Sequence, residues 1–137
     1  ERDGRAIYGD AQDAIENLLA MLTSPEMKTN VIVIAHGVYM EQGDGTSKIF
    51  PQGVGQKLSP KIPQYFPSVI YYTNKGGKRT IQLKSTAMID LANPAPFAMP
   101  DTLDVETGLA KFFAVLREPP QQEPTAKPKS LKLERIK

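Results

Sequence analysis

The chain has 137 residues, of which 40% are hydrophobic, so it is long enough for one domain with a hydrophobic core. It contains no cysteine and one histidine, which excludes a disulfide framework and thiolate metal ligands and argues against a zinc site. No apolar run approaches the roughly 18 residues that span a bilayer, and there is no N-terminal signal pattern, so we expect no membrane segment.

Charge is unevenly distributed along the chain. Counting Lys and Arg against Asp and Glu gives −3 for residues 1–36, +5 for 37–86, −3 for 87–116 and +3 for 117–137, which add to the net charge of +2. The positive charge therefore follows the most apolar stretch of the chain and returns at its end. Such segregation hints at an anionic partner, nucleic acid or phosphate, although exposed lysines usually form only a solvated surface.

A helix and then a buried strand are predicted for the N-terminal part. Apolar residues at spacings of 3, 4 and 7 predict a helix from Asp10 to Leu22, which Asp10 can cap. The run Asn30–His36 contains four successive β-branched residues and predicts a strand buried on both faces, as in a parallel sheet. His36 ends this strand, and open α/β sheets bind ligands at the carboxyl ends of their strands. His36 is therefore a candidate functional residue, with an ordinary strand-end hydrogen bond as the alternative.

Short elements are expected in the middle of the chain. Five glycines in residues 37–55 predict a long loop or a loose hairpin that turns at Gly43-Asp44-Gly45. Ser59-Pro60 is a plausible start for a short second helix. Two strands, residues 68–73 and 78–85, should flank a turn at residues 74–77.

Proline-rich segments dominate the C-terminal part. Three prolines between residues 88 and 101 predict an extended crossing with Phe97 in the core. Asp104 to Arg117 predicts a last helix with Phe112 on its inner side. Residues 118–137 form a Pro/Lys-rich basic tail that cannot bury enough apolar area to fold alone, and its alternating end could add to a sheet edge or dock on a partner.

The order of these features resembles the C-terminal half of a RecA-like P-loop ATPase, of the phage-type group that acts in single-strand recombination and annealing. The resemblance covers roughly residues 8–116. It rests on the initial helix followed by four segments, Val31-Ile32-Val33-Ile34-Ala35-His36, Gly55-Gln56-Lys57-Leu58, Val69-Ile70-Tyr71-Tyr72 and Thr80-Ile81-Gln82-Leu83-Lys84. It implies an α/β fold, a RecA-like partial core in residues 1–117 with a central, mostly parallel sheet, a C-terminal hairpin and flanking helices.

The resemblance also implies roles for two candidate catalytic residues. His36 matches a strand-end polar residue that contacts the γ-phosphate of ATP and couples nucleotide state to the DNA-binding loop, a position at which many RecA-type proteins have glutamine. Lys84 matches a lysine that reaches the γ-phosphate bound by a neighbouring subunit, although Thr86 stands where a second lysine is expected. An exposed strand lysine is the equally weighted alternative for Lys84.

Single-stranded DNA is the partner implied for the basic segment. Residues 37–61 and the tail would make the contact, with Lys48, Lys57 and Lys61 neutralising phosphates and Tyr39 offering a stacking face. We also expect a homo-oligomer in the cytoplasm, that of the host if the chain is phage-encoded.

The phosphate loop and the magnesium-binding acidic strand of the family are absent from residues 1–137. ATP and Mg²⁺ would therefore be cofactors of a longer protein, which the first residue Glu1 favours, and this chain alone should not hydrolyse ATP. The alternative function is a non-catalytic interaction or structural module of a phage assembly that uses the basic loop and the tail.

Overall fold

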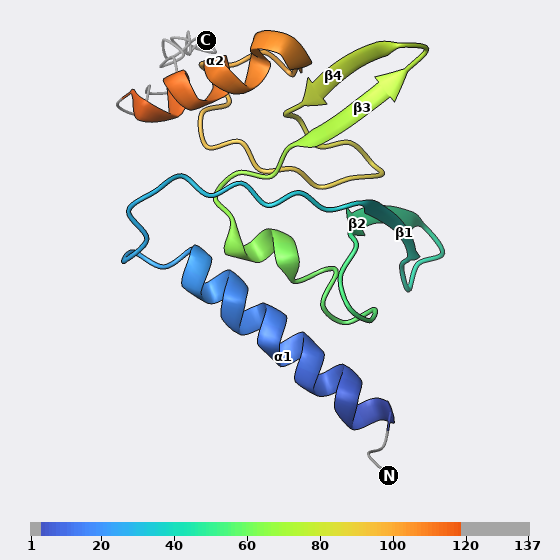
Figure 1. Cartoon of the computed structure of the whole chain (residues 1–137). Coiled ribbons are helices and arrows are strands. Elements are labelled where there is room, and N and C mark those ends of the chain that lie inside the picture. Colours follow the sequence, from blue (N-terminus) through green and yellow to red (C-terminus); the bar gives the residue numbers. More distant parts are fainter. Residues whose placement is uncertain (1–3, 119–137) are drawn as a thin grey trace, which may run out of the picture.

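The computed structural model describes residues 4–118. Two helices lie toward opposite ends of the molecule in Figure 1, α1 (Gly4–Leu22) and α2 (Val105–Arg117). Between them in the chain come β1 (Gly37–Glu41), β2 (Ser47–Pro51), the 3-10 turn η1 (Ile62–Tyr65), β3 (Tyr71–Lys75), β4 (Lys78–Gln82) and β5 (Thr102–Asp104). No helix in this described part is long and apolar enough to cross a membrane.

The first hydrophobic cluster joins α1 to the η1 region. Helix α1 begins at Gly4, six residues before the predicted start, and ends at Leu22 as expected. Its only buried residue, Leu19, packs with Leu58 and Ile62, while Ile15, Tyr65 and Phe66 are partly buried around them. Because only one side of its C-terminal half finds partners, α1 leaves Ile7 and Met21 more than half exposed.

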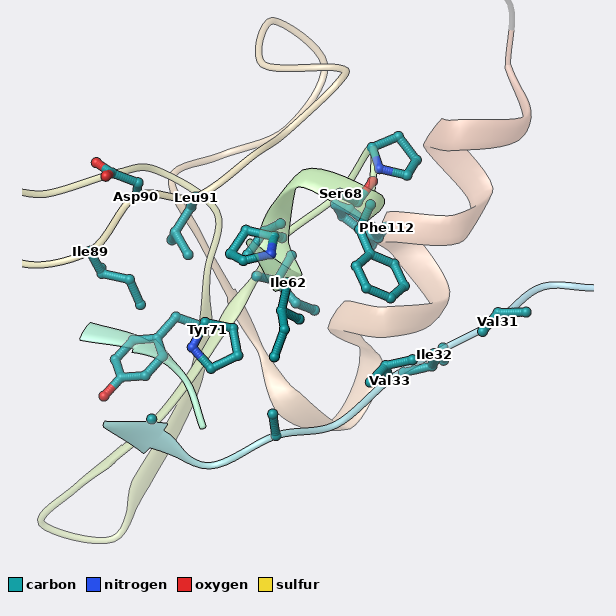
Figure 2. Close-up of a pocket in the computed structure, with 18 of the residues that line it drawn as sticks. Val31, Ile32, Val33, Ile62, Ser68, Tyr71, Ile89, Asp90, Leu91 and Phe112 are labelled. Atoms are coloured by element: carbon teal, nitrogen blue, oxygen red, sulfur yellow. The ribbon is translucent and has the colours of Figure 1, made fainter. Parts of the chain in front are cut away.

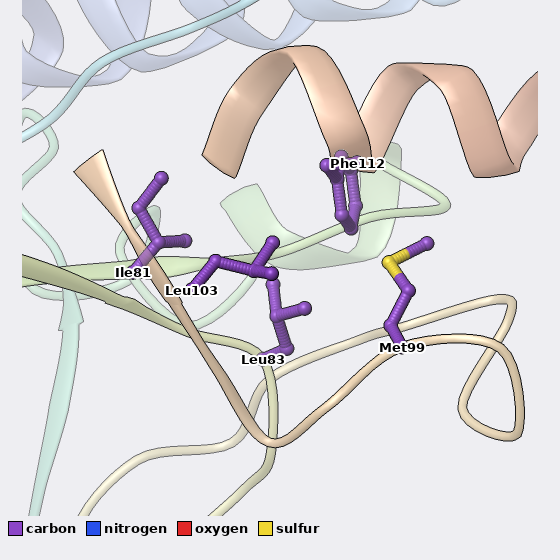
Figure 3. Packing of buried hydrophobic residues seen from close by; sticks show 5 residues of the cluster. All are labelled: Ile81, Leu83, Met99, Leu103 and Phe112. Carbon is purple, nitrogen blue, oxygen red and sulfur yellow. The ribbon is translucent and has the colours of Figure 1, made fainter. Parts of the chain in front are cut away.

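The second hydrophobic cluster lies between α2 and a three-stranded antiparallel sheet with the order β3-β4-β5. Its buried members are Ile81, Leu83, Met99, Leu103 and Phe112. Figure 3 shows Phe112 of α2 pointing toward Met99 and Leu83. The predicted last helix is confirmed, and Asp104 caps it because its carboxylate accepts a hydrogen bond from the backbone N–H of Thr107 at 2.9 Å.

Two hairpins organise the strands. β1 and β2 pair antiparallel around a turn in which Asp44 accepts a hydrogen bond from the backbone N–H of Thr46, so the hairpin alternative predicted for this segment is correct. β3 and β4 pair antiparallel around Gly76 and Gly77, whose φ angles of 58° and 82° suit the two-residue turns that need a left-handed backbone. Adjacent strands joined by such short turns must run antiparallel.

The predicted α/β fold class, a RecA-like partial core with a central, mostly parallel sheet, is wrong. The described residues form two separate antiparallel sheets, of two and three strands. The run Asn30–His36, which was expected to be the central strand, belongs to neither sheet. A parallel neighbour requires a crossover connection of a dozen or more residues. Here hairpin turns join β1 to β2 and β3 to β4, and β5 also pairs antiparallel with β4.

Three local expectations also differ from the structure. Phe97, expected in the core, is 56% exposed, and Met99 takes the buried position. The second helix is reduced to the 3-10 turn η1, in which Pro63 supplies no backbone N–H for a longer helix. The segment before Tyr71 pairs only through an isolated bridge between Val69 and Ala92. The predicted tail lies outside the described residues from residue 119 onward.

Candidate functional site

An extended apolar segment crosses the molecule between the two hydrophobic clusters. Residues 30–36 carry no regular secondary structure, and Ile34 is 91% exposed, Ile32 57% and Val33 43%. Within the described part of the chain, no backbone hydrogen bond joins residues 30–35 to another segment. We call residues 30–35 the apolar strand segment. It combines solvent-exposed β-branched side chains with unpaired backbone groups, which is unusual for a folded protein.

A groove of about 520 Å³ runs beneath this segment. Figure 2 shows Val31, Ile32 and Val33 along one side of the groove, with Phe112 of α2 across from them and Ile62 to the left of both. Other lining residues are Ile49, Phe66, Tyr71, Ile89, Leu91, Leu109 and Leu116. Ile62 of the first hydrophobic cluster and Phe112 of the second both line the groove, so the groove lies between the two clusters. We refer to it as the apolar groove.

His36 lies where the apolar strand segment enters β1. Its backbone carbonyl accepts a hydrogen bond from the N–H of Gln52 at 2.6 Å, and its exposed side chain lines the apolar groove. Lys84 does not line this groove, and its ammonium pairs instead with Asp101 at 3.1 Å. The structure therefore does not bring the two candidate catalytic residues together. Within residues 4–118 no group of three or more His, Asp or Glu side chains could hold a metal ion.

Two of the candidate nucleic-acid-binding lysines are neutralised by acidic side chains. Lys48 of β2 pairs with Asp90 at 2.7 Å, and Lys61 pairs with Glu16 of α1 at 2.9 Å. The side-chain hydrogen bond to Glu16 raises the pKa of Lys61 above its ordinary value. These ion pairs connect segments more than 40 residues apart, which gives both lysines a structural role.

The other two candidate nucleic-acid-binding residues, Tyr39 and Lys57, are exposed. Tyr39 is 64% exposed on β1, and it stands opposite Ile49 while Lys48 stands opposite Met40. Since neighbouring positions in a strand face opposite sides, Tyr39 and Lys48 project from opposite faces of the hairpin. Lys57 is exposed and makes no ion pair within the part of the chain that the structure describes.

The apolar groove was missed by the sequence reasoning. It is formed by residues that are up to 87 positions apart, from Asn30 to Arg117, and no local pattern reports that their elements leave a space. The one available signal was the run of four successive β-branched residues, Val31–Ile34, which we interpreted as a strand buried in a sheet. The same composition also fits a segment that awaits a partner.

Comparisons with protein-family models, with curated proteins and with solved structures found no match to this chain. The function must therefore be argued from the site itself.

Proposed function

We propose that the protein is a non-catalytic interaction module that assembles with copies of itself by pairing of the apolar strand segment. The observation that carries this proposal is the unpaired, exposed and extended backbone of residues 30–35. Natural edge strands are protected by charges, prolines or bulges that prevent association. From Thr29 to Met40 this chain has neither a charged residue nor a proline.

A second copy is the occupant that fits the sequence of the segment. Antiparallel pairing about a two-fold axis at Val33 places Ile32 opposite Ile34 and Val31 opposite Ala35, so the central facing pairs are apolar, and Asn30 faces His36 beyond them. Two-fold interfaces require this kind of self-complementary surface. Pairs of β-branched residues across antiparallel strands each contribute roughly 0.2–1 kcal/mol relative to alanine pairs.

The exposed area of the chain is also large enough for such an interface. The accessible surface is 11383 Å², whereas a compact monomer of 15.1 kDa exposes about 7,100 Å². Even if residues 1–3 and 119–137 are counted at the full area of an unfolded chain, the described residues expose roughly 1,500 Å² more than a compact domain of their size. An interface of standard size removes about 800 Å² from each partner.

Sedimentation of the full chain over a range of concentrations tests this proposal. We expect concentration-dependent dimers for the parent and monomers for Ile32→Lys, because a lysine opposite Ile34 would lose the apolar contact. Ile7→Lys, at a site on α1 that is 51% exposed against 57% for Ile32, is the matched control and should dimerise like the parent.

A parent that stays monomeric, or an equal loss of dimers in Ile7→Lys, would contradict the proposal. If deletion of residues 119–137 is what exposes the segment and starts association, the tail and not a second copy occupies the segment in the parent. Hydrogen exchange of the amides of residues 31–35 provides the direct readout, since protection that rises with protein concentration requires pairing between copies.

An ATP-dependent function on single-stranded DNA is the second candidate. It is favoured by the direct continuity of the apolar strand segment, His36 and the hairpin that exposes Tyr39. In this function His36 would respond to the γ-phosphate and Tyr39 would stack on a base, while ATP and Mg²⁺ would be held by a partner polypeptide that supplies a phosphate loop. The chain alone is expected to show no ATP turnover.

Fluorescence anisotropy of a labelled single-stranded oligonucleotide tests the DNA contact. Tyr39→Ala should weaken binding by about 1–3 kcal/mol with little change in its salt dependence, because stacking is not an ionic interaction. Tyr8→Ala is the control, since Tyr8 is 63% exposed on α1. Equal binding by the parent and both variants would remove Tyr39 from the contact.

A further inference from the structure

The β3–β4 hairpin carries a group of cations that form no ion pair with any described residue. Within residues 4–118 the ion pairs involve Lys48, Lys61, Lys84 and Lys111. None of them involves the three cations of this hairpin, Lys75, Lys78 and Arg79, all of which are exposed. The hairpin therefore presents three uncompensated positive charges within five residues.

The geometry of the hairpin concentrates these charges at its tip. Lys75 and Lys78 stand directly opposite each other across the turn, and like charges in facing positions destabilise an antiparallel pair. Gly76 and Gly77 form the turn between them and bring no side chain that could shield either ammonium group. Figure 1 shows this tip at the outer edge of the molecule, away from α2.

The surrounding sequence strengthens the positive potential. Between Asp44 and Asp90 the chain has seven Lys and Arg residues and no Asp or Glu. Three of these cations, Lys48, Lys61 and Lys84, form ion pairs with acids outside the stretch. Their partners are Asp90, Glu16 and Asp101. Summed charge of this kind attracts and orients polyanions.

An aromatic face lies beside the cations. Tyr72 is 52% exposed on β3 and pairs with Ile81, while Arg79 pairs with Asn74 two positions away. Tyr72 and Arg79 are thus diagonal neighbours on one face of the ribbon, within reach of a shared ligand. Lys75 and Lys78 project from the other face, so a strand that contacts all four residues must pass around the tip from one face to the other.

We propose that the β3–β4 hairpin is a binding element for single-stranded nucleic acid, with Lys75, Lys78 and Arg79 on phosphates and Tyr72 stacked on a base. Exposed aromatic faces combined with cations bind single strands without sequence preference. An acidic protein would not require the tyrosine. A membrane surface would require large apolar side chains at the tip, which is Asn74-Lys75-Gly76-Gly77-Lys78.

This inference rests on the second candidate function, DNA binding, because it assumes the same ligand. It uses different residues, since Tyr39 and Lys48 belong to the β1–β2 hairpin. The test is anisotropy of labelled oligodeoxythymidine of about 30 nucleotides, titrated with the full chain at several salt concentrations. Lys75→Gln/Lys78→Gln should lower the log–log salt slope by about 1.4, and Tyr72→Ala should weaken binding roughly 5- to 150-fold with the slope unchanged. The control is Lys28→Gln, since Lys28 lies outside the hairpin and makes no ion pair within residues 4–118.

The outcomes distinguish whether the protein binds single-stranded nucleic acid from whether the β3–β4 hairpin makes the contact. If Tyr39→Ala weakens binding and the hairpin variants match the parent, DNA binding stands and the hairpin proposal is overturned. If the parent binds no oligonucleotide, both fail. Equal binding of polyglutamate or of phosphatidylserine vesicles, with Tyr72→Ala unaffected, would show a general attraction for anions and overturn the assignment to nucleic acid.

Discussion

Asp104 acts on the fold through both its position and its charge. It ends β5 and caps α2, where its carboxylate accepts hydrogen bonds from the backbone N–H and the hydroxyl of Thr107. These two hydrogen bonds lower the pKa of Asp104 below its ordinary value of 3.8, and the one from the backbone N–H of Thr107 has the larger effect. A carboxylate at this place also interacts favourably with the positive end of the helix dipole.

The cap predicts a pH-dependent effect of Asp104→Asn, which keeps an oxygen acceptor but loses the charge. Because the folded pKa lies below the unfolded one, the stabilisation is complete above 3.8 and is lost as the pH falls through the folded value. Thermal unfolding at pH 7 should therefore show a lower midpoint for the variant, and the difference should shrink as the pH falls below 3.8. Asp10→Asn, in the interior of α1, is the control that removes a carboxylate without removing a cap. A difference that persists unchanged at low pH would count against the charge effect.

Close packing of α2 on the sheet depends on Gly108. A Cβ atom at this position would lie 2.9 Å from the Cβ of Leu103 and 3.3 Å from Cδ1 of Ile81, both of which are buried core residues. The helix therefore accepts the unfavourable helix propensity of glycine in exchange for contact with β4 and β5. On α1, a Cβ added at Gly9 would meet nothing within 4 Å.

The two glycines predict opposite results for the same substitution. Gly108→Ala should destabilise the protein by about 1–3 kcal/mol, since overpacking outweighs the gain in helix propensity. Gly9→Ala should stabilise it by about 0.5–1 kcal/mol, because only the propensity changes. Chemical denaturation of both variants measures the two free energies of unfolding. Stabilisation by Gly108→Ala would mean that α2 does not sit this close to the sheet.

Local patterns were sufficient for the elements that local chemistry decides. The last helix and the turn at Gly76 and Gly77 were predicted because the residues that determine them are close together in the sequence. The strand pairing around that turn was predicted as well. The predicted cap at Asp10 was wrong, since α1 begins at Gly4 and Asp10 lies inside it. The apolar run at residues 30–36 could not be assigned in this way, since β-branched residues signal a strand but not which neighbours it has.

At the scale of the whole molecule, the residues that line the apolar groove come from distant segments that no sequence pattern connects. The order of elements suggested one parallel sheet, and the structure has two antiparallel sheets with separate hydrophobic clusters. His36 and Tyr39 were named as candidate site residues from the sequence, and both are exposed. The sequence could not show that Lys48 and Lys61 have acidic partners. Those partners, Asp90 and Glu16, are 42 and 45 positions distant.

The apolar strand segment has a consequence for how the protein must be produced. A β-branched run without charge or proline is the kind of stretch that nucleates fibrils when it is solvent-exposed. Pairing between two copies satisfies one edge of each strand and leaves the other edge free. If two copies pair as proposed, the free edge of Val31–Ile34 would still allow further stacking at high concentration, so we expect purified protein to aggregate less when it is dilute.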